Sequence, residues 1–409
     1  MNGRGVSPTS MRSALVALVA CQVGLHACVQ GARLAAPLSV LRLGHSEWAV
    51  GLVMTMFALF PAIFAIPAGR LADRHGYHLP VRIAAGLSLA GALLAASVPH
   101  LIALCAAAAL CGAGSGFGMI AIQRTASRFA RDEADRLRVF SWIALAPAVA
   151  GLFGPMMAGV LIDHLGFSAA FAALALLPFA TLVIAQAVPH ESRASVSALN
   201  RKQTSAWGLL RLPSFRRLLL VNWLVSASWD VHGFALPILG VERGFSASAL
   251  GAVLAAYAVA SMSVRVVIPF VAERLPRRHL LAGALFITCL VFVLYPLLQS
   301  AWAMALCAAT LGLALGAIQP TILATLHQVT PRERHGEALA FRSMTVHASM
   351  TAMPLLFGAI GASAGAAVLF WVMAAALGLG GLQARRIDTD NGVPARREEH
   401  PQQEERTCS

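Results

Sequence analysis

The chain has 409 residues, of which 58% are hydrophobic and only 12% are charged, and its mean hydropathy is +0.72. This small number of polar residues cannot cover the surface of a water-soluble domain of this size. The composition therefore excludes a soluble globular protein and predicts a membrane protein. A net charge of +13 would suit a nucleic-acid partner, but the basic residues flank apolar segments, which indicates membrane topology and no nucleic acid.

About twelve apolar segments follow one another along the chain. A helix needs roughly 20 apolar residues to cross about 30 Å of hydrocarbon. The first segment carries polar residues and continues as a full-length span, so we interpret it as a membrane helix and not as a cleaved signal. The sequence therefore predicts an all-α polytopic protein with spans near residues 14–38, 47–70, 79–98, 100–124, 139–163, 167–188, 215–240, 248–272, 279–300, 302–328, 337–361 and 363–383.

The second half of the chain repeats the first at an offset of 200 residues. The repeat falls on polar, proline and glycine positions, where Gln22 matches Asn222, Pro37 matches Pro237 and Gly51 matches Gly251. Corresponding spans read in the same register, as in parallel duplications that build two lobes around a central polar cavity. We expect an N-terminal six-helix lobe at 1–188, a cytoplasmic linker at 189–214, a C-terminal six-helix lobe at 215–384 and a disordered cytoplasmic tail at 385–409.

Basic residues mark one side of the membrane. Of the 31 Lys and Arg residues, only Arg33, Arg42 and Arg243 fall at or near the loops that we place outside. By the positive-inside rule, both termini and the central linker are then cytoplasmic. We expect a multi-pass protein of the inner (plasma) membrane, with membrane lipids as partners of its basic loops.

A short motif lies between the second and third predicted spans. Gly69, Asp73, Arg74 and Gly76 fit the pattern Gly-x-x-x-Asp-Arg-x-Gly. This resembles the cytoplasmic loop signature of the major facilitator superfamily, although Tyr77 and the next residue stand where two basic residues are usual. The resemblance covers essentially the whole chain, and implies a twelve-helix fold of two six-helix lobes, alternating access between the two sides, and a monomer.

The same motif predicts a cytoplasmic gate. Exposed amides at a helix start in the other lobe, together with Arg342, would attract the Asp73 carboxylate. In the repeated copy of the motif, Glu273 and Arg274 stand at the equivalent place, and Glu273 would act likewise near Arg138. We hypothesise that these contacts hold the cytoplasmic side shut; the alternative is that Asp73 and its neighbour only anchor a tight turn.

The fifth span contains Gly154, Pro155 and Gly159 in a pattern that resembles the Gly-Pro motif of proton-coupled drug exporters. The alternative reading is a close-packed helix with a proline kink, because small residues let helices approach closely. In the fourth span, the segment 115–118 resembles the end of an exporter motif that carries a buried arginine, but Gly112 occupies the place of that arginine. The direction of transport therefore stays open.

Polar residues spaced by four lie on one face of the first and seventh spans. In facilitator-like folds these two helices line the central cavity, so the resemblance implies that both polar stripes face the substrate. The candidates for the substrate cavity are Gln22, His26 and Gln30 on the first span, Asn222, Ser226 and Trp229 on the seventh, Tyr257 and Arg265 on the eighth, and Gln319 and Thr321 on the tenth.

Asp230 is the only carboxylate that we place deep in a span. An isolated charge there costs several kcal/mol, so the group is neutral, paired or hydrated. Burial disfavours the charged form of a carboxylate, which suits a side chain that takes up and releases one proton per cycle. The alternative is a structural aspartate paired with His232 or a neighbouring arginine. His26 either relays protons or forms a hydrogen bond between helices.

Together with the family resemblance, these patterns predict a secondary active transporter that exports a small organic compound against proton entry. One alternative is an importer or facilitator of an organic anion, favoured if Arg265 and His26 face the cavity, and another is a non-transporting membrane sensor. No phosphate loop, nucleophile elbow or metal-ligand spacing is present in the sequence, so we expect no enzyme activity, no cofactor and no metal.

Overall fold

The computed structural model describes residues 8–129, 133–189, 206–272, 276–330 and 335–387. Each of its twelve α-helices is long and apolar enough to cross a membrane, which confirms the predicted number of spans. Its described part contains helices and no strand, namely α1 (Pro8–Arg42), α2 (Glu47–His75), α3 (His78–Ser97), α4 (Leu101–Phe129), α5 (Glu133–Leu165), α6 (Phe167–Ile184), α7 (Pro213–Glu242), α8 (Ala247–Ala272), α9 (Arg277–Leu294), α10 (Ala301–Val329), α11 (His335–Ala364) and α12 (Ala366–Arg385), with short 3₁₀ helices η1 (Ala185–Ala187), η2 (Ala206–Arg211) and η3 (Tyr295–Leu297).

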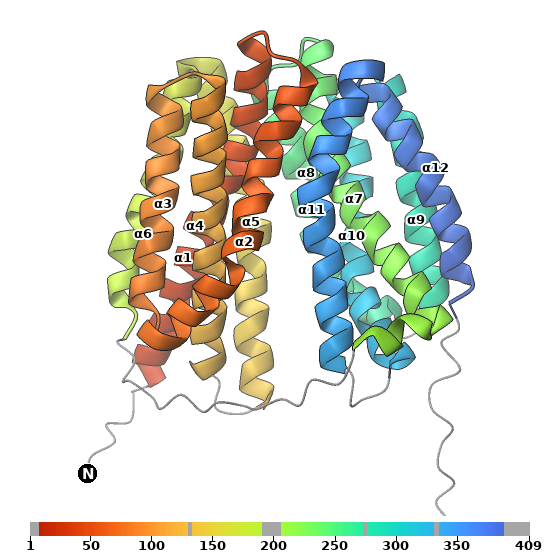
Figure 1. Ribbon diagram of the computed structural model, residues 1–409, viewed down its shortest axis with the longest axis horizontal. Coiled ribbons are helices and arrows are strands. Elements are labelled where there is room, and N and C mark those ends of the chain that lie inside the picture. The colour runs from red at the N-terminus through yellow and green to blue at the C-terminus, as the bar shows by residue number, and fades with distance from the viewer. Residues whose placement is uncertain (1–7, 130–132, 190–205, 273–275, 331–334, 388–409) are drawn as a thin grey trace, which may run out of the picture.

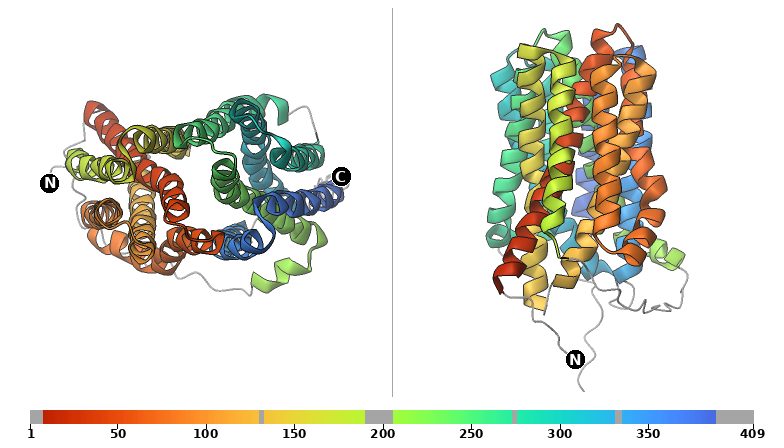
Figure 2. Two further views of the ribbon diagram at one scale, coloured as in Figure 1. Left: turned by 90° about the horizontal axis from the view of Figure 1, so that it is seen from above. Right: turned by 90° about the vertical axis from the view of Figure 1, so that its left-hand side faces the viewer.

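The helices form two lobes, α1–α6 and α7–α12, which stand side by side in Figures 1 and 2. In the first lobe α4 packs against α1, α2 and α3, while in the second α10 packs against α8 and α9. We call the end where α1 begins and α12 ends the terminal end, and the opposite end the distal end. The exact lobe and linker boundaries stay a prediction, because residues 190–205 and 388–409 lie outside the described residues.

The two distal turns show the internal repeat in the backbone. The turn between α1 and α2 contains Gly44 with a φ of 79°, and the turn between α7 and α8 contains Gly244 with a φ of 70°. A positive φ is costly for residues with a Cβ atom, so each turn depends on glycine. At this end α1 continues to the turn and not only to the point where hydropathy falls, so it extends beyond the predicted apolar segment to Arg42.

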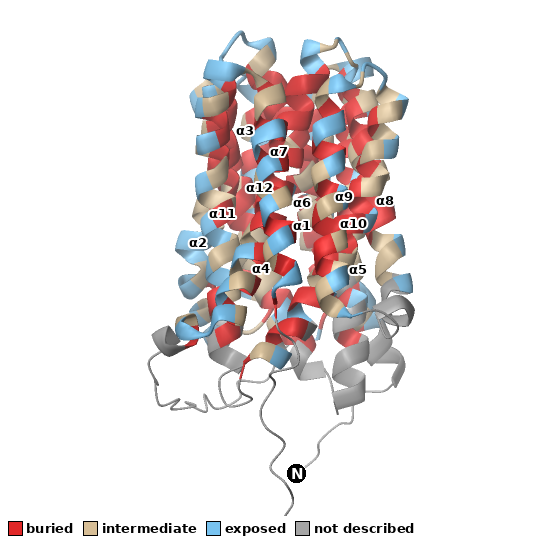
Figure 3. Ribbon diagram, turned by 90° about the vertical axis from the view of Figure 1, so that its right-hand side faces the viewer, coloured by how far each residue is buried: buried red, intermediate tan, exposed pale blue. Residues whose placement is uncertain are grey.

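Apolar side chains cover the outside of the bundle, as a lipid-facing surface requires. Trp302 is 87% exposed and Ile102 is 73% exposed, whereas buried residues fill the space between helices (Figure 3). Among the spans, α7 is the most enclosed, because 83% of the residues in its apolar stretch are buried. Its polar residues therefore face protein and not lipid.

The lobes meet along two seams, one between α2 and α11 and one between α5 and α8. A Cβ atom on Gly51 of α2 would lie 2.5 Å from the Pro354 carbonyl oxygen, and one on Gly251 of α8 would lie 2.7 Å from the Pro155 carbonyl oxygen. Both contacts lie in the distal half, where backbones touch, and the ribbons of the two lobes diverge toward the terminal end (Figure 1).

Candidate functional site

The polar stripe on α1 begins with two side chains that bind each other. The Gln22 Nε2 atom lies 2.8 Å from the His26 Nδ1 atom, as the spacing of one helical turn allows. Gln22 is buried, and within the described part of the chain its Oε1 atom has no hydrogen-bond partner. Further along α1, Gln30 Nε2 would lie 3.9 Å from a Cβ atom on Gly151 of α5, next to Ala258 of α8. Gln30 therefore lies where α1 and α5 meet the second lobe.

The stripe on α7 consists of Asn222, Ser226 and Asp230, which are spaced by four, and all three side chains are buried. Asn222 is 1% exposed, and neither atom of its side-chain amide has a hydrogen-bond partner among the described residues. The hydroxyl of Ser349 on α11 donates a hydrogen bond of 3.0 Å to Asp230 Oδ2. Asp230 is therefore a solvent-shielded carboxylate with one neutral donor on a neighbouring helix.

The charge that faces Asp230 comes from the other lobe. Arg33 on α1 is half-buried, and it acts electrostatically on the buried Asp230 carboxylate. The prediction that Arg33 lies at or near an outer loop is wrong, because α1 continues to Arg42 and leaves Arg33 well inside the helix. A count of basic residues cannot separate a loop arginine from one that is kept in the interior by a carboxylate.

His232 does not pair with Asp230. Residues two positions apart on a helix face different directions. The Tyr295 hydroxyl lies 3.4 Å from the His232 Nδ1 atom, and the His232 ring lies 4.9 Å from the Tyr257 ring. Of the two structural partners considered for Asp230, the structure favours the neighbouring arginine.

Aromatic candidates link α7 to α8. The ring of Trp229, which is 44% exposed, meets the ring of Tyr257 edge to face at 5.6 Å. Arg265, two turns further along α8, interacts electrostatically with the Tyr257 hydroxyl. Arg265 therefore acts on the aromatic group that contacts α7.

Arg342 Nη2 on α11 donates a hydrogen bond to Gln319 Oε1 on α10, while Arg342 Nε is buried and has no partner among the residues that the structure describes. Gln319 therefore binds Arg342, the arginine that the gate hypothesis expects to bind Asp73. Thr321 donates its hydroxyl hydrogen to the carbonyl of Ala317 at 2.9 Å, within its own helix.

The loop motif for which we predict a gating role, from Gly69 to Gly76, lies at the terminal end of α2. Gly76 has a φ of 70° and its N–H bonds to the Ala72 carbonyl, so it forms the turn that ends the helix. Gly69 lies two turns earlier, and Arg74 is exposed. Tyr77 is fully buried, and because burial raises the pKa of its hydroxyl it stays neutral. The side chains of Asp73 and Arg138, and the residues Glu273 and Arg274, lie outside the described part.

The Gly-Pro motif of α5 is a contact surface for two helices. Gly154 packs against the α1 backbone at Ala27, and Gly159 packs against Ala247 of α8, with no space for a Cβ atom at either glycine. Pro155 is buried, and its carbonyl faces Gly251. These contacts favour the close-packing reading of the motif.

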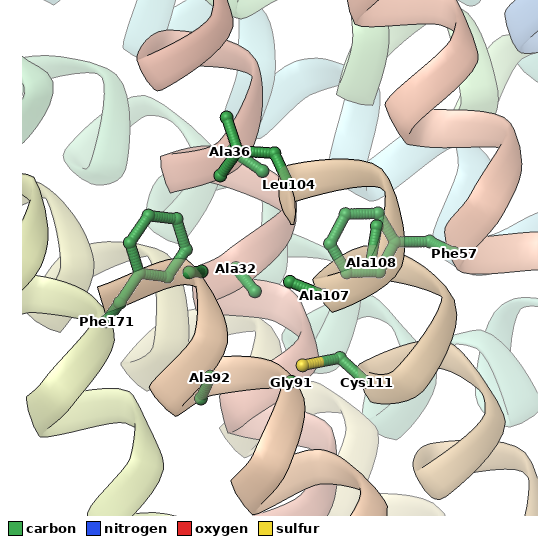
Figure 4. A pocket seen from close by; sticks show the side chains of 11 residues that line it. Ala32, Ala36, Phe57, Gly91, Ala92, Leu104, Ala107, Ala108, Cys111 and Phe171 are labelled. Carbon is green, nitrogen blue, oxygen red and sulfur yellow. The ribbon is translucent and has the colours of Figure 1, made fainter. Parts of the chain in front are cut away.

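One hollow lies within the first lobe, and no residue of either polar stripe lines it (Figure 4). Its walls come from α1, α2, α3, α4 and α6, and they are apolar, with Phe57, Leu104 and Phe171 as the largest lining side chains. A hollow with no polar group offers nothing that orients a substrate. The candidate site is therefore the polar region between the lobes.

Two residues that form contacts between lobes were missed by sequence reasoning. The sequence places Arg33 only at or near an outer loop, and it gives no reason to single out Asp163 near the end of α5. Asp163 accepts hydrogen bonds from backbone N–H groups of α8. Backbone partners leave no side-chain pattern, so the sequence contained no signal for this contact.

Twelve spanning helices in two similar lobes, joined by distal seams around buried polar groups, define a polytopic membrane transporter fold. The model of the Major Facilitator Superfamily matches residues 18–221 and again residues 218–406, so the chain belongs to that superfamily. The double match agrees with the internal repeat.

Among curated proteins, a "Multi-drug resistance efflux pump PmrA homolog" from Lactococcus lactis subsp. lactis (strain IL1403) is 24% identical over 345 residues, covering 78% of this chain and 79% of the relative. Among solved structures, the nucleoside transporter NupG has a TM-score of 0.76 at 13% identity, covering 91% of this chain and 99% of that chain. A bacterial homolog of the human lysosomal transporter Spinster, inward-facing and unoccupied, has a TM-score of 0.70 at 13% identity over 93% and 94% of the two chains. At these identities the structures show the fold alone.

Proposed function

We propose that this transporter exports a small organic compound in exchange for protons, with Asp230 as the proton-carrying residue. The observation that supports this role is the position of Asp230, buried on α7 with Ser349 of its own lobe on one side and Arg33 of the other lobe facing it. The similarity to a multidrug efflux pump supports the direction of transport.

The charge of Asp230 links protonation to lobe movement. When Asp230 is ionised, its attraction to Arg33 favours the approach of α7 to α1. When Asp230 takes up a proton, that attraction is lost and only neutral hydrogen bonding remains. One proton therefore changes the force between the two lobes, which is what coupling to alternating access requires.

The substrate binds to the polar stripes in this proposal. Asn222 offers one donor and one acceptor that have no partner, and Gln22 offers an acceptor. Trp229 offers a partly exposed aromatic face to a ring-bearing compound. A neutral or cationic organic compound with an aromatic ring and an amide or hydroxyl group fits these contacts.

The second candidate function is transport of an organic anion. The interaction between Arg265 and Tyr257 favours it, because an arginine near the α7 aromatic group can bind a carboxylate through two hydrogen bonds. His26 is already bound to Gln22, so it supports this candidate less than Arg265 does.

We also place the terminal end in the cytoplasm of a cell whose plasma membrane holds the monomer, in agreement with the basic loops. In the outward-facing state of this proposal, the Asp73 carboxylate would accept hydrogen bonds from the backbone N–H groups at the start of α11 and from Arg342. Arg342 Nη2 donates to Gln319 in the present conformation, so in this proposal the other N–H groups of the guanidinium bind Asp73 when the gate closes.

The test is proton movement in proteoliposomes that contain a pH-sensitive dye and an acid-loaded lumen. Wild type and Asp230→Asn are challenged with lipophilic cations, neutral aromatics and small organic anions. Substrate-evoked proton efflux in wild type that is absent in the variant supports antiport through Asp230. Transport without a proton signal would mean a facilitator or exchanger, and a response to anions alone would favour the second candidate.

A further inference from the structure

Asp163 joins the two lobes at the distal end. Its Oδ1 atom accepts a hydrogen bond of 2.9 Å from the N–H of Ala247, and its Oδ2 atom accepts one of 2.7 Å from the N–H of Ser248. Asp163 lies near the end of α5 in the first lobe, whereas Ala247 and Ser248 begin α8 in the second. Both carboxylate oxygens therefore bind the backbone of the other lobe.

These contacts complete the start of α8. The first N–H groups of a helix have no partner within the helix. The Ser246 hydroxyl accepts from the N–H of Ala249 at 3.2 Å, so the second lobe itself satisfies one of these donors. Asp163 satisfies the two that precede it, and the partial positive charge of a helix start strengthens a bond to a carboxylate.

The helix backbones are in contact beside Asp163. One turn earlier on α5, Gly159 packs against Ala247 so closely that a Cβ atom has no room. The carboxylate is thus positioned by tight packing of two helices and not by a flexible loop. It is exposed to solvent on its outer side, so water can replace the amides when the seam opens.

The equivalent seam between α2 and α11 has no such contact among the described residues. At the position 200 residues after Asp163 stands Ser363, whose hydroxyl donates to the Ile360 carbonyl of its own helix at 3.0 Å. Ser46, which precedes α2, makes no side-chain cap. The contact is therefore a feature of one seam and is not a by-product of the internal repeat.

We propose that Asp163, Ala247 and Ser248 form a distal latch, which stabilises the closed distal end and has to break before the transporter can open there. The proposal concerns the balance between two conformations and holds whatever the substrate is. A carboxylate that accepts two backbone N–H bonds biases that balance by about tenfold or more, because hydrogen bonds to charged groups contribute more than neutral ones.

The experiment measures distances between spin labels on the full chain in nanodiscs, with labels carried by unnatural amino acids so that the native cysteines stay in place. One pair at Pro99 and Gln299 reports on the distal end, and a second at Arg82 and His279 reports on the terminal end; none of the four positions is buried. No substrate or proton gradient is present, so the outcome does not depend on the proposed transport function.

We expect Asp163→Asn to raise the ratio of open to closed distal ends by about tenfold and to shorten the terminal distance at the same time. Asp163→Glu retains the charge and should retain part of the closed population. Ser363→Ala, at the matched position of the other seam, should leave both distance distributions unchanged.

Unchanged distances in Asp163→Asn and Asp163→Ala, in protein that elutes as a single species, would overturn the proposal. So would a wild type whose distal end is open throughout. Hydrogen exchange gives a second measure that needs no labels, since the amides of Ala247 and Ser248 should exchange about tenfold faster in Asp163→Asn than in wild type. Equal exchange rates would also count against the latch.

Discussion

Arg33 and Asp230 illustrate how one residue pair can serve both stability and function. Asp230 is buried and Arg33 is half-buried, and the two opposite charges attract each other across the lobe interface. Removing one partner of a buried pair leaves an uncompensated charge, which costs more than removing both. The pair is therefore sensitive to single substitutions in a way that a surface ion pair is not.

We expect Arg33→Gln to lower the free energy of unfolding by about 1–3 kcal/mol, because the buried Asp230 then loses the opposite charge that offsets its burial. The double variant Arg33→Gln, Asp230→Asn should recover most of this loss. Thermal unfolding of the purified protein in detergent measures both. Additive effects of the two single changes would show that the charges do not interact.

Arg243 stabilises a helix end in the second lobe. Its guanidinium donates to the Tyr295 carbonyl at 3.2 Å and to the Pro296 carbonyl at 2.6 Å. Arg243→Lys keeps the charge but loses the fork geometry, so we expect a loss of about 1–2 kcal/mol. The control is Arg42→Lys, since Arg42 lies over the Phe167 ring at 5.4 Å, a contact that lysine can also make. Equal losses at both sites would contradict the role of the two carbonyls.

At the scale of helices, close backbone contact determines which glycines are required. On α3, a Cβ atom on Gly91 would lie 2.8 Å from the Ala107 carbonyl oxygen of α4, whereas one on Gly86 would meet nothing within 4 Å. The same helix thus contains a glycine that packs and one that does not. The close approach of α3 and α4 depends on Gly91.

We expect Gly91→Ala to destabilise the protein by about 1–3 kcal/mol, since the added methyl group forces α3 away from α4. Gly86→Ala should be neutral or stabilise by up to about 1 kcal/mol through helix propensity. Melting temperatures of the two variants compare these effects. If Gly86→Ala lost as much stability as Gly91→Ala, the loss would come from the backbone conformation of α3 and not from its packing against α4.

Hydropathy predicts the helices well, and residue spacing predicts the polar stripes, because both patterns are local and recur along the chain. The spacing of Gln22 and His26 indicates a shared face, and the two side chains bind each other in the structure. Contacts between lobes are different, since they depend on how two rigid bodies dock. The pairing of Arg33 with Asp230, and of Asp163 with backbone amides, is visible only when both lobes are seen together.

For the whole molecule, the arrangement predicts that movement of one lobe against the other is needed for transport. A Cβ atom on Gly361 of α11 would lie 3.6 Å from the Glu47 Cβ of α2, within the range for a disulfide. Glu47→Cys with Gly361→Cys should therefore form a bond across the seam, and the replaced glutamate makes room for it.

In proteoliposomes, oxidation of that double variant should reduce transport by at least about tenfold, and a reducing agent should restore it, because the bond keeps the distal end closed. Each single variant serves as a control and should not respond to oxidant. Full transport by a protein shown to be cross-linked would mean that the distal seam does not open during the cycle.

The enclosure of α7 also affects how the protein is made. The apolar stretch of this helix has a mean hydropathy of only 1.3, against 2.4 for α9, and other helices cover its polar residues in the folded state. During synthesis α7 emerges before the two helices that pack on it, α11 and α12. Its insertion into the bilayer is therefore less favourable than that of α9 until later spans arrive. A chain truncated after α7 should insert this segment less efficiently than a chain truncated after α9 inserts α9, as glycosylation mapping can measure.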